Sequence, residues 1–255
     1  MTRAASMLVL ALDTTTRAGS LALARDDRLL EAWSGDPDLT HASRLPGDIL
    51  DILRRHGLAL ADVDLYGVAA GPGSFTGLRI GIATVQGLAF AQGRKVVGVS
   101  ALEALAWSAG EPAGSTSLVA AWMDARRGEV FASLGTPGEP VSLAGPEVAS
   151  PGEVLGRWDG LVGRRPVVWV GDGALAYRAL IEQGARGRAW AVLPEVPMLA
   201  AAIAAIARRR ASAGEATPPH GVRPLYVRRP DAELARDRKR AATGAAEAGR
   251  REDRR

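Results

Sequence analysis

Short apolar runs alternate with polar turns through the first hundred residues, a pattern that predicts strands interspersed with helices. The apolar runs predict five strands, at residues 7–13, 21–24, 29–34, 63–70 and 95–100. A helix is expected over residues 39–57, with Gly57 at its end and one apolar face made of Leu45, Ile49, Ile52 and Leu53. Two more helices are expected, one from the glycine-containing loop at residues 71–77 to Gly93, and one over residues 101–109.

The second half of the chain begins with a pattern similar to that of the first. Residues 7–24 (MLVLALDTTTRAGSLALA) and 117–134 (SLVAAWMDARRGEVFASL) each contain an apolar run, an Asp, a turn with Gly and another apolar run. Asp13 corresponds to Asp124 and Gly19 to Gly128, which indicates a weak internal repeat. The remaining pattern predicts strands at 166–174, 189–194 and 223–229, and helices at 175–183 and 198–211.

Two such halves predict a duplicated α/β fold with two lobes. The arrangement resembles the actin, Hsp70 and sugar-kinase (ASKHA) superfamily, in which hairpin turns of both lobes grip the phosphates of ATP. We expect an N-terminal lobe at residues 7–105, a C-terminal lobe at 106–230 and a charged, disordered tail at 231–255.

Composition excludes several classes of site. The 255 residues are 47% hydrophobic and 24% charged, which suits a globular chain with a substantial core. The absence of cysteine excludes disulfides, thiolate metal sites and cysteine nucleophiles. No run approaches the about 18 apolar residues that cross a bilayer. The short run Met7–Leu12 ends in Asp13 and is interpreted as a buried strand rather than a signal peptide. These features predict a cytoplasmic protein without membrane contact.

The net charge of +4 belongs to the end of the chain. Residues 228–255 contain ten Arg and Lys against six Asp and Glu, whereas residues 1–227 contain 22 of each sign. The body therefore has no compositional signature of binding DNA or RNA directly.

The loop GPGSFTG, residues 71–77, joins a predicted strand to a predicted helix and raises the question of phosphate binding. A Walker loop requires Lys and a hydroxyl residue after its last glycine, where this chain has Leu78 and Arg79. The dinucleotide fingerprint requires G-x-G-x-x-G, and these glycines are one residue too widely spaced. Two interpretations remain. Either the free N–H groups of the turn receive an anion, or Ser74 or Thr76 simply caps the helix.

The helix after this loop is small or apolar on nearly every face. Its small residues are Gly77, Gly81, Ala83, Thr84, Gly87, Ala89 and Ala91. A helix of this kind is expected to be buried on nearly all sides. It is either the central helix of one core or a helix between its own sheet and a partner chain.

The strongest polar cluster lies at the end of the first predicted strand. Asp13, Thr14 and Thr15, together with Gly71, Gly73 and Ser74 of the loop, are the candidate phosphate-binding residues. Asp13 either orients magnesium-bound water at a phosphate, as in kinase-like proteins, or caps its own turn. In the second half, Arg126 and Arg127 stand where short hydroxyl residues would meet phosphate, which weakens the case for a complete ATP site.

Five segments together resemble the TsaB (YeaZ) family. They are LALDTTTRAGSLAL, THASRLPGDILDIL, GPGSFTGLRIGIATVQGLAFA, MDARRGEVFASL and PLYVR, and the resemblance extends from Met7 to Arg229. The long run GPGSFTGLRIG is the most specific of these segments.

The resemblance implies a companion subunit of TsaD, the catalytic paralogue that transfers threonylcarbamoyl to the adenosine beside the tRNA anticodon, together with the ATPase TsaE. It also implies pairing through the first helices, with TsaD or as a homodimer, and contact with tRNA only through the complex. The expected contact residues are Ser43, Leu45, Ile49, Gly77, Gly81, Thr84, Gly87 and Ala91. No cofactor is assigned to this chain, and ATP with magnesium is expected only at the level of the complex.

The histidines depart from the catalytic relatives, which bind metal through an H-x-x-x-H pair. This chain has only His41, His56 and His220, and no pair at that spacing, so we expect neither a metal site nor catalytic residues. His41 begins a predicted helix, where an exposed or capping role is expected. His56 lies at the C-terminus of the same helix, which suits a protonated imidazole.

Two functions follow from the sequence. The first is a non-catalytic scaffold that supports TsaD. The second is an independent ATP-binding enzyme of the sugar-kinase superfamily, with Asp13, Thr14, Ser74 and the glycine loop holding the nucleotide.

Overall fold

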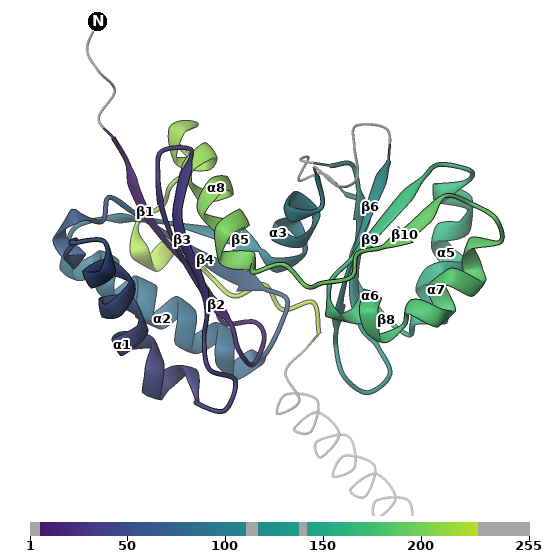
Figure 1. Cartoon of the computed structure of the whole chain (residues 1–255), viewed down its shortest axis with the longest axis horizontal. Helices are drawn as coiled ribbons and strands as arrows, with labels where there is room; N and C mark the ends of the chain where they lie inside the picture. Colours follow the sequence, from purple (N-terminus) through teal and green to yellow (C-terminus); the bar gives the residue numbers. More distant parts are fainter. Residues whose placement is uncertain (1–5, 111–116, 138–141, 229–255) are drawn as a thin grey trace, which may run out of the picture.

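Two five-stranded mixed sheets with one common topology form the framework of the chain (Figure 1). The computed structural model describes residues 6–110, 117–137 and 142–228. The first sheet has the order β3-β2-β1-β4-β5 and consists of β1 (Leu8–Asp13), β2 (Ser20–Arg25), β3 (Arg28–Ser34), β4 (Leu65–Gly71) and β5 (Lys95–Ser100). The second has the order β10-β9-β6-β7-β8 and consists of β6 (Leu118–Asp124), β7 (Val130–Gly135), β8 (Ser142–Ala149), β9 (Val167–Val170) and β10 (Trp190–Val192).

The strand pairings confirm the duplication that the sequence predicts. In each sheet the first strand pairs antiparallel with the second and parallel with the fourth, as β1 does with β2 and β4, and β6 with β7 and β9. Asp13 and Asp124 end the corresponding strands β1 and β6. Gly19 and Gly128 both lie in the left-handed region, with φ of 59° and 75°, in the turns that follow.

Helices cover both sheets in layers (Figure 1). Helices α1 (His41–Arg55) and α2 (Phe75–Ala91) pack on the outer face of the first sheet, and α3 (Ala101–Ser108) and α8 (Leu199–Ser212) lie between the sheets. The outer face of the second sheet carries α5 (Pro151–Val162), α6 (Asp172–Ala176) and α7 (Arg178–Ala185). Two short 3-10 helices, η1 (Leu60–Asp62) and η2 (Pro219–Gly221), complete the fold. None of the helices in the described parts of the chain is long and apolar enough to cross a membrane.

Three apolar clusters follow from this layering. One lies beneath α1 and α2, and a second, beneath α5 and α7, contains the buried side chains of Trp122, Trp158 and Trp169. The third joins the facing sides of both sheets through α3 and α8. Because this central cluster belongs to both lobes, the lobes share one continuous core.

Several elements differ from the prediction. Helix α8 packs on the first sheet, although the boundary at residue 105 assigns it to the second lobe, because its alanine-rich face fills the space beside β1 and β4. Residues 223–229 are predicted as a strand, but their described part forms none. The segment makes a single backbone hydrogen bond to β4, from Leu225 N to Ala70 O. The expected tail, 231–255, lies outside the described residues.

Strand β8 and helix α5 are absent from the prediction. A Gly-Pro pair interrupts the apolar pattern of β8, and three glycines dilute that of α5. Helix α5 nevertheless carries a recognisable N-terminal signal, since Ser150 and Glu153 form a capping box and Pro151 occupies the first turn.

The turn after β1 packs directly on α2, and two glycines make this contact possible. The Thr14 hydroxyl donates a 2.8 Å hydrogen bond to the Gly77 carbonyl in a fully buried position. A Cβ atom on Gly77 would lie 2.0 Å from the Thr14 carbonyl oxygen, and one on Gly81 would lie 2.2 Å from Thr14 Oγ1. A side chain at Gly81 or Gly77 therefore forces the turn away from the helix. Gly87, on the same helix, has no atom within 4 Å of such a position.

This difference predicts opposite effects of two identical substitutions. Gly81→Ala should lower the free energy of unfolding by about 1–3 kcal/mol because the new methyl group collides with the buried Thr14 side chain. Gly87→Ala should raise it by up to about 1 kcal/mol because alanine favours the helix and meets open space. Denaturant unfolding followed by tryptophan fluorescence measures both. Equal stabilisation by the two substitutions would contradict the close contact.

Candidate functional site between the lobes

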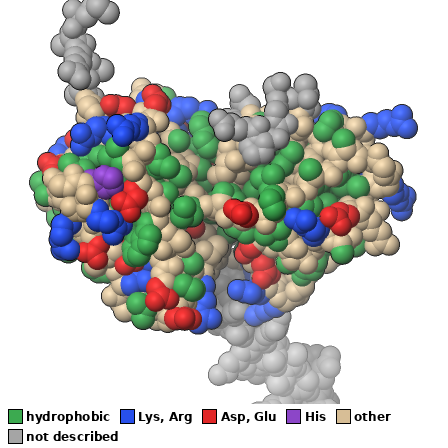
Figure 2. Space-filling view, viewed as in Figure 1, with side chains coloured by type: hydrophobic (Ala, Val, Ile, Leu, Met, Phe, Trp, Pro, Cys, Tyr) green, Lys and Arg blue, Asp and Glu red, His purple; other side chains and the backbone are tan. Residues whose placement is uncertain are grey.

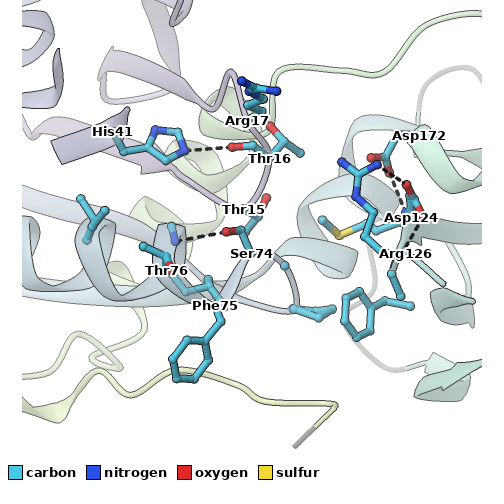
Figure 3. Close-up of a pocket in the computed structure, with 18 of the residues that line it drawn as sticks. Thr15, Thr16, Arg17, His41, Ser74, Phe75, Thr76, Asp124, Arg126 and Asp172 are labelled. Carbon is cyan, nitrogen blue, oxygen red and sulfur yellow. Dashed lines mark hydrogen bonds and ion pairs between the residues drawn. The ribbon is translucent and has the colours of Figure 1, made fainter. Parts of the chain in front are cut away.

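A cleft of about 760 Å³ separates the two hairpin turns at the ends of β1 and β6. One wall comes from the first lobe and is made by Thr15, Thr16 and Arg17 of the first hairpin turn and by the loop Pro72–Thr76 (Figure 3). The opposite wall is made by the turn Asp124–Arg126 and by Asp172 at the start of α6. Residues 225–228 also line the cleft. The corresponding turns of the two lobes thus face one another, as the duplicated fold requires.

Asp13 lies behind the first wall and caps its own turn. Its Oδ1 accepts hydrogen bonds from the Thr15 amide at 2.8 Å and the Thr15 hydroxyl at 2.6 Å. Burial raises the pKa of the Asp13 carboxyl, while the two hydrogen bonds from Thr15 act in the opposite direction. The carboxyl does not line the cleft. Of the two interpretations of Asp13, these contacts match the turn cap.

The other candidate phosphate-binding residues divide into two groups. Thr15, Gly73 and Ser74 line the cleft, whereas Thr14 and Gly71 are buried behind it. Ser74 caps α2, since its Oγ accepts a hydrogen bond from Gly77 N at 3.2 Å. Its own amide donates to the Thr15 carbonyl at 2.9 Å, which joins the loop to the first hairpin. Ser74, rather than Thr76, is therefore the cap that the sequence left open.

The acidic side chains of the second wall are engaged by their neighbours. Asp124 accepts a hydrogen bond from Arg126 N at 2.8 Å and forms an ion pair with the Arg126 guanidinium at 3.0 Å. Asp172 accepts from Asp124 N at 3.0 Å and from Gly173 N at 2.9 Å. Asp172 was not among the predicted site residues, although the run GDG directly after the apolar strand β9 is a turn signal. Across the described residues, no group of three or more His, Cys, Asp or Glu side chains is placed to hold a metal ion.

His41 occupies a buried position that corrects the expected exposed or capping role. Its Nε2 lies 2.9 Å from the Thr16 carbonyl oxygen, and its Nδ1 lies 3.0 Å from Arg44 Nη2. Because a guanidinium only donates, Nδ1 accepts and the Nε2 proton is donated to Thr16. Arg44 is a residue that the sequence analysis did not identify. It is buried, pairs with Asp48 and donates to the Ala18 carbonyl. His41 and Arg44 thus attach α1 to the first hairpin turn.

The other two histidines do not take part in this network. His56 forms the C-cap of α1, as expected, and its Nε2 lies 2.8 Å from Glu31 Oε2. His220 lies in η2.

The eight residues expected to contact a partner chain are divided between the interior and the surface. Leu45 and Ile49 are buried in the core beneath α1, and Gly77 and Gly81 lie against Thr14. These four are therefore structural residues of this chain rather than surface contacts. Ser43, Thr84, Gly87 and Ala91 retain exposed or partly exposed positions on the outer side of α1 and α2.

The outer side of α2 is uncovered within this chain, so α2 is not the central helix of a single core, and the interpretation with a partner chain stays a prediction. Phe90 is 81% exposed, and Leu50 on α1 is 46% exposed. We define the pairing face as ten of the exposed uncharged residues of these helices, namely Ala42, Ser43, Pro46, Gly47 and Leu50 of α1 and Thr76, Ala83, Gly87, Phe90 and Ala91 of α2, which leaves out the exposed charged residues Asp51, Arg54, Arg55 and Arg79. The positions on α1, and those on α2 from Ala83 onward, recur at spacings of three or four residues, so they form one stripe on each helix.

Comparisons with known proteins identify a family and relatives that agree with one another. The family profile "TsaD: tRNA N6-adenosine threonylcarbamoyltransferase" matches residues 38–235. The tRNA threonylcarbamoyladenosine biosynthesis protein TsaB of Escherichia coli (strain K12) is 41% identical over 125 residues, which cover 49% of this chain and 53% of the relative. The match thus spans about half the length of that relative. TsaB of Bacillus subtilis (strain 168) is 29% identical over 234 residues, or 89% of this chain and 96% of that protein.

Solved structures extend the likeness to the fold. An ATP- or polyphosphate-dependent glucomannokinase from Arthrobacter sp. strain KM, 12% identical, has a TM-score of 0.52 over 80% of this chain and 98% of its own, which supports the two-lobed ASKHA fold alone. YeaZ from Pseudomonas aeruginosa has a TM-score of 0.69 and 32% sequence identity, over 86% of this chain and 99% of its own. With this nearly full-length likeness and the profile match, the chain belongs to the TsaB (YeaZ) group of the TsaD family.

Proposed function

We propose that this chain is a non-catalytic subunit of the complex that synthesises threonylcarbamoyladenosine on tRNA. In this role it binds and stabilises the catalytic paralogue TsaD and recruits the ATPase TsaE. The participation in this modification is supported by the names of the E. coli and B. subtilis relatives and by the family profile. The scaffold role rests on one observation, which is the uncovered pairing face on α1 and α2.

The pairing face has the properties that close helix packing requires. Ala83, Gly87 and Ala91 recur at four-residue spacing and carry little or no side chain, so a partner helix can approach the α2 backbone. Phe90 and Leu50 supply apolar area, and burying most of a phenylalanine contributes about 1.5–3 kcal/mol. A paralogue of the same fold presents an equivalent pair of helices, which makes a pseudo-symmetric contact possible. The same geometry permits a homodimer when TsaD is absent.

Contact with tRNA is assigned to the complex rather than to this chain. The body of the chain has equal numbers of acidic and basic residues. On the face seen in Figure 2, the Lys and Arg side chains are interspersed with Asp and Glu and form no continuous basic zone. Tight binding to a phosphate backbone generally depends on such a zone.

The alternative is an independent ATP-binding enzyme, which the cleft between the hairpin turns favours. The residues present do not fit magnesium ATP well. Asp13 is held behind Thr15, Asp124 is paired with Arg126, and Asp172 accepts two backbone hydrogen bonds. These three carboxylates are thus engaged within their own turns, which disfavours a role in orienting magnesium-bound water, so the scaffold role is preferred.

A bulky residue on the pairing face should prevent pairing without unfolding the chain. Gly87→Arg places a long charged side chain where a partner helix must approach, and we expect at least a 100-fold weaker affinity for TsaD, a loss of about 2.7 kcal/mol. Light scattering coupled to size-exclusion chromatography measures the pairing. Gly156→Arg is the matched control, because Gly156 is also an exposed helical glycine with no atom within 4 Å but lies on α5. An intact pair with Gly87→Arg would refute the proposed interface.

The subunit should stimulate threonylcarbamoyl transfer only when it pairs. The test is a reconstitution with TsaD, TsaE, threonylcarbamoyl adenylate and tRNA. We expect the unmodified chain and the Gly156→Arg variant to raise the rate of tRNA modification, and the Gly87→Arg variant to leave that rate unchanged. Stimulation by Gly87→Arg equal to that by the unmodified chain would separate activity from the pairing face and contradict the scaffold role.

The isolated chain should not bind magnesium ATP with micromolar affinity. Isothermal titration of the chain alone measures this binding. We expect it to be weak because Asp13, Asp124 and Asp172 are already bonded within their own turns. Micromolar binding accompanied by turnover would favour the independent enzyme.

A further inference from the structure

The described C-terminal segment, residues 222–228, crosses from the first lobe to the second along the edge of the cleft (Figure 1). Its first part is attached to the first lobe. Val222 is buried in the core beneath α2, and its carbonyl accepts a 3.0 Å hydrogen bond from the Gln86 side chain. Leu225 N donates to the Ala70 carbonyl at 2.6 Å. The segment is therefore anchored at both α2 and the end of β4.

The next residue of the segment contacts the beginning of α2. The Tyr226 ring stacks on Phe75 with 5.2 Å between ring centroids, and its hydroxyl lies 3.2 Å from Arg79 Nε. The Arg79 guanidinium lies over the Phe75 ring, 4.1 Å from its centroid. This contact sits at one end of the helix that carries the pairing face.

The last described residue is attached to the second lobe. Arg228 Nη1 donates to the Ala125 carbonyl at 2.7 Å, and Nη2 is bonded to Glu129. Its guanidinium also lies 5.6 Å from the centroid of the Phe131 ring. Ala125 and Glu129 belong to the turn between β6 and β7, which forms the second wall of the cleft. A guanidinium that is bound at two points of one turn restricts that turn more than a single ion pair does.

We infer that residues 222–228 are an interlobe latch that sets the width of the cleft, with Arg228 as its fastening residue. The apolar cluster at α3 and α8 joins the lobes on the inner side, where it permits the small rotations that packed helices undergo. The latch spans the cleft itself and opposes such rotation. It also connects the second hairpin turn to α2 through Tyr226, so the pairing helix and the far wall of the cleft are joined by one short segment.

Interlobe distances measured in the isolated chain test this inference. Because the chain contains no cysteine, spin labels can be attached at two introduced cysteines, Lys95→Cys in the first lobe and Gln183→Cys in the second, which are both exposed positions. Electron–electron double resonance then reports the distance distribution between the lobes. We expect Arg228→Met to broaden the distribution and shift it to longer distances, because both contacts to the second hairpin are lost.

Matched variants give the experiment its controls. Arg223→Met removes an exposed arginine of the same segment and should leave the distribution unchanged. Glu129→Gln should broaden it, and the double variant with Arg228→Met should be no broader than Arg228→Met alone, because contacts within one latch are not additive. An Arg228→Met distribution identical to that of Arg223→Met would overturn the inference, as would additive effects. None of these results depends on TsaD, so the latch and the scaffold role fail independently.

Discussion

The buried hydrogen bond from the Thr14 hydroxyl to the Gly77 carbonyl joins the turn after β1, which lines the cleft, to α2, which carries the pairing face. It holds the turn after β1 against α2 at a distance that only glycine at positions 77 and 81 permits. From the other side, His41 and Arg44 of α1 bond to carbonyls at Thr16 and Ala18 in the same turn. The cleft wall and the pairing face are thus opposite sides of one tightly packed unit.

This packing gives the loop GPGSFTG a structural role in place of the phosphate-binding role that its glycines suggest. Its Ser74 amide is bonded to Thr15, its Ser74 hydroxyl caps α2, and Gly73 lies close to the Thr15 side chain. The glycines allow the loop, the turn and the helix to approach one another within a single lobe. These glycines therefore serve packing inside the chain. The glycine that faces outward, Gly87, comes ten residues after the loop. The run of small residues in the loop and α2 therefore contains both glycines that pack inside the chain and a glycine that faces outward.

The sequence could predict the duplicated architecture because hydrophobic periodicity and the paired Asp-turn-Gly hairpins are local signals. It could not separate Gly81 from Gly87, because both are small residues in an apolar helix and only the distant Thr14 distinguishes them. For the same reason Leu45 and Ile49 were expected at a partner contact, although a helix turns its most apolar face to its own core first. The role of Arg44 was equally hidden, since a buried arginine is recognised only from the carbonyls and carboxylate that surround it.

The two halves have the same topology, but different side chains hold their hairpin turns in place. This difference affects which groups are free to contact a ligand. In the first half, hydroxyl groups, glycines and a buried arginine bind the turn to α1 and α2. In the second half, the turn is held by Asp124 bonded to Arg126, by Asp172 and by Arg228 reaching across from the first lobe. A nucleotide-dependent member of this fold needs polar groups of both turns free to face the phosphates. Here Asp13 bonds to Thr15 and Asp124 bonds to Arg126, and part of the exposed apolar surface, including Leu50 and Phe90, lies on the outside of α1 and α2. These contacts support the proposed role in binding a protein over the alternative role in binding a nucleotide.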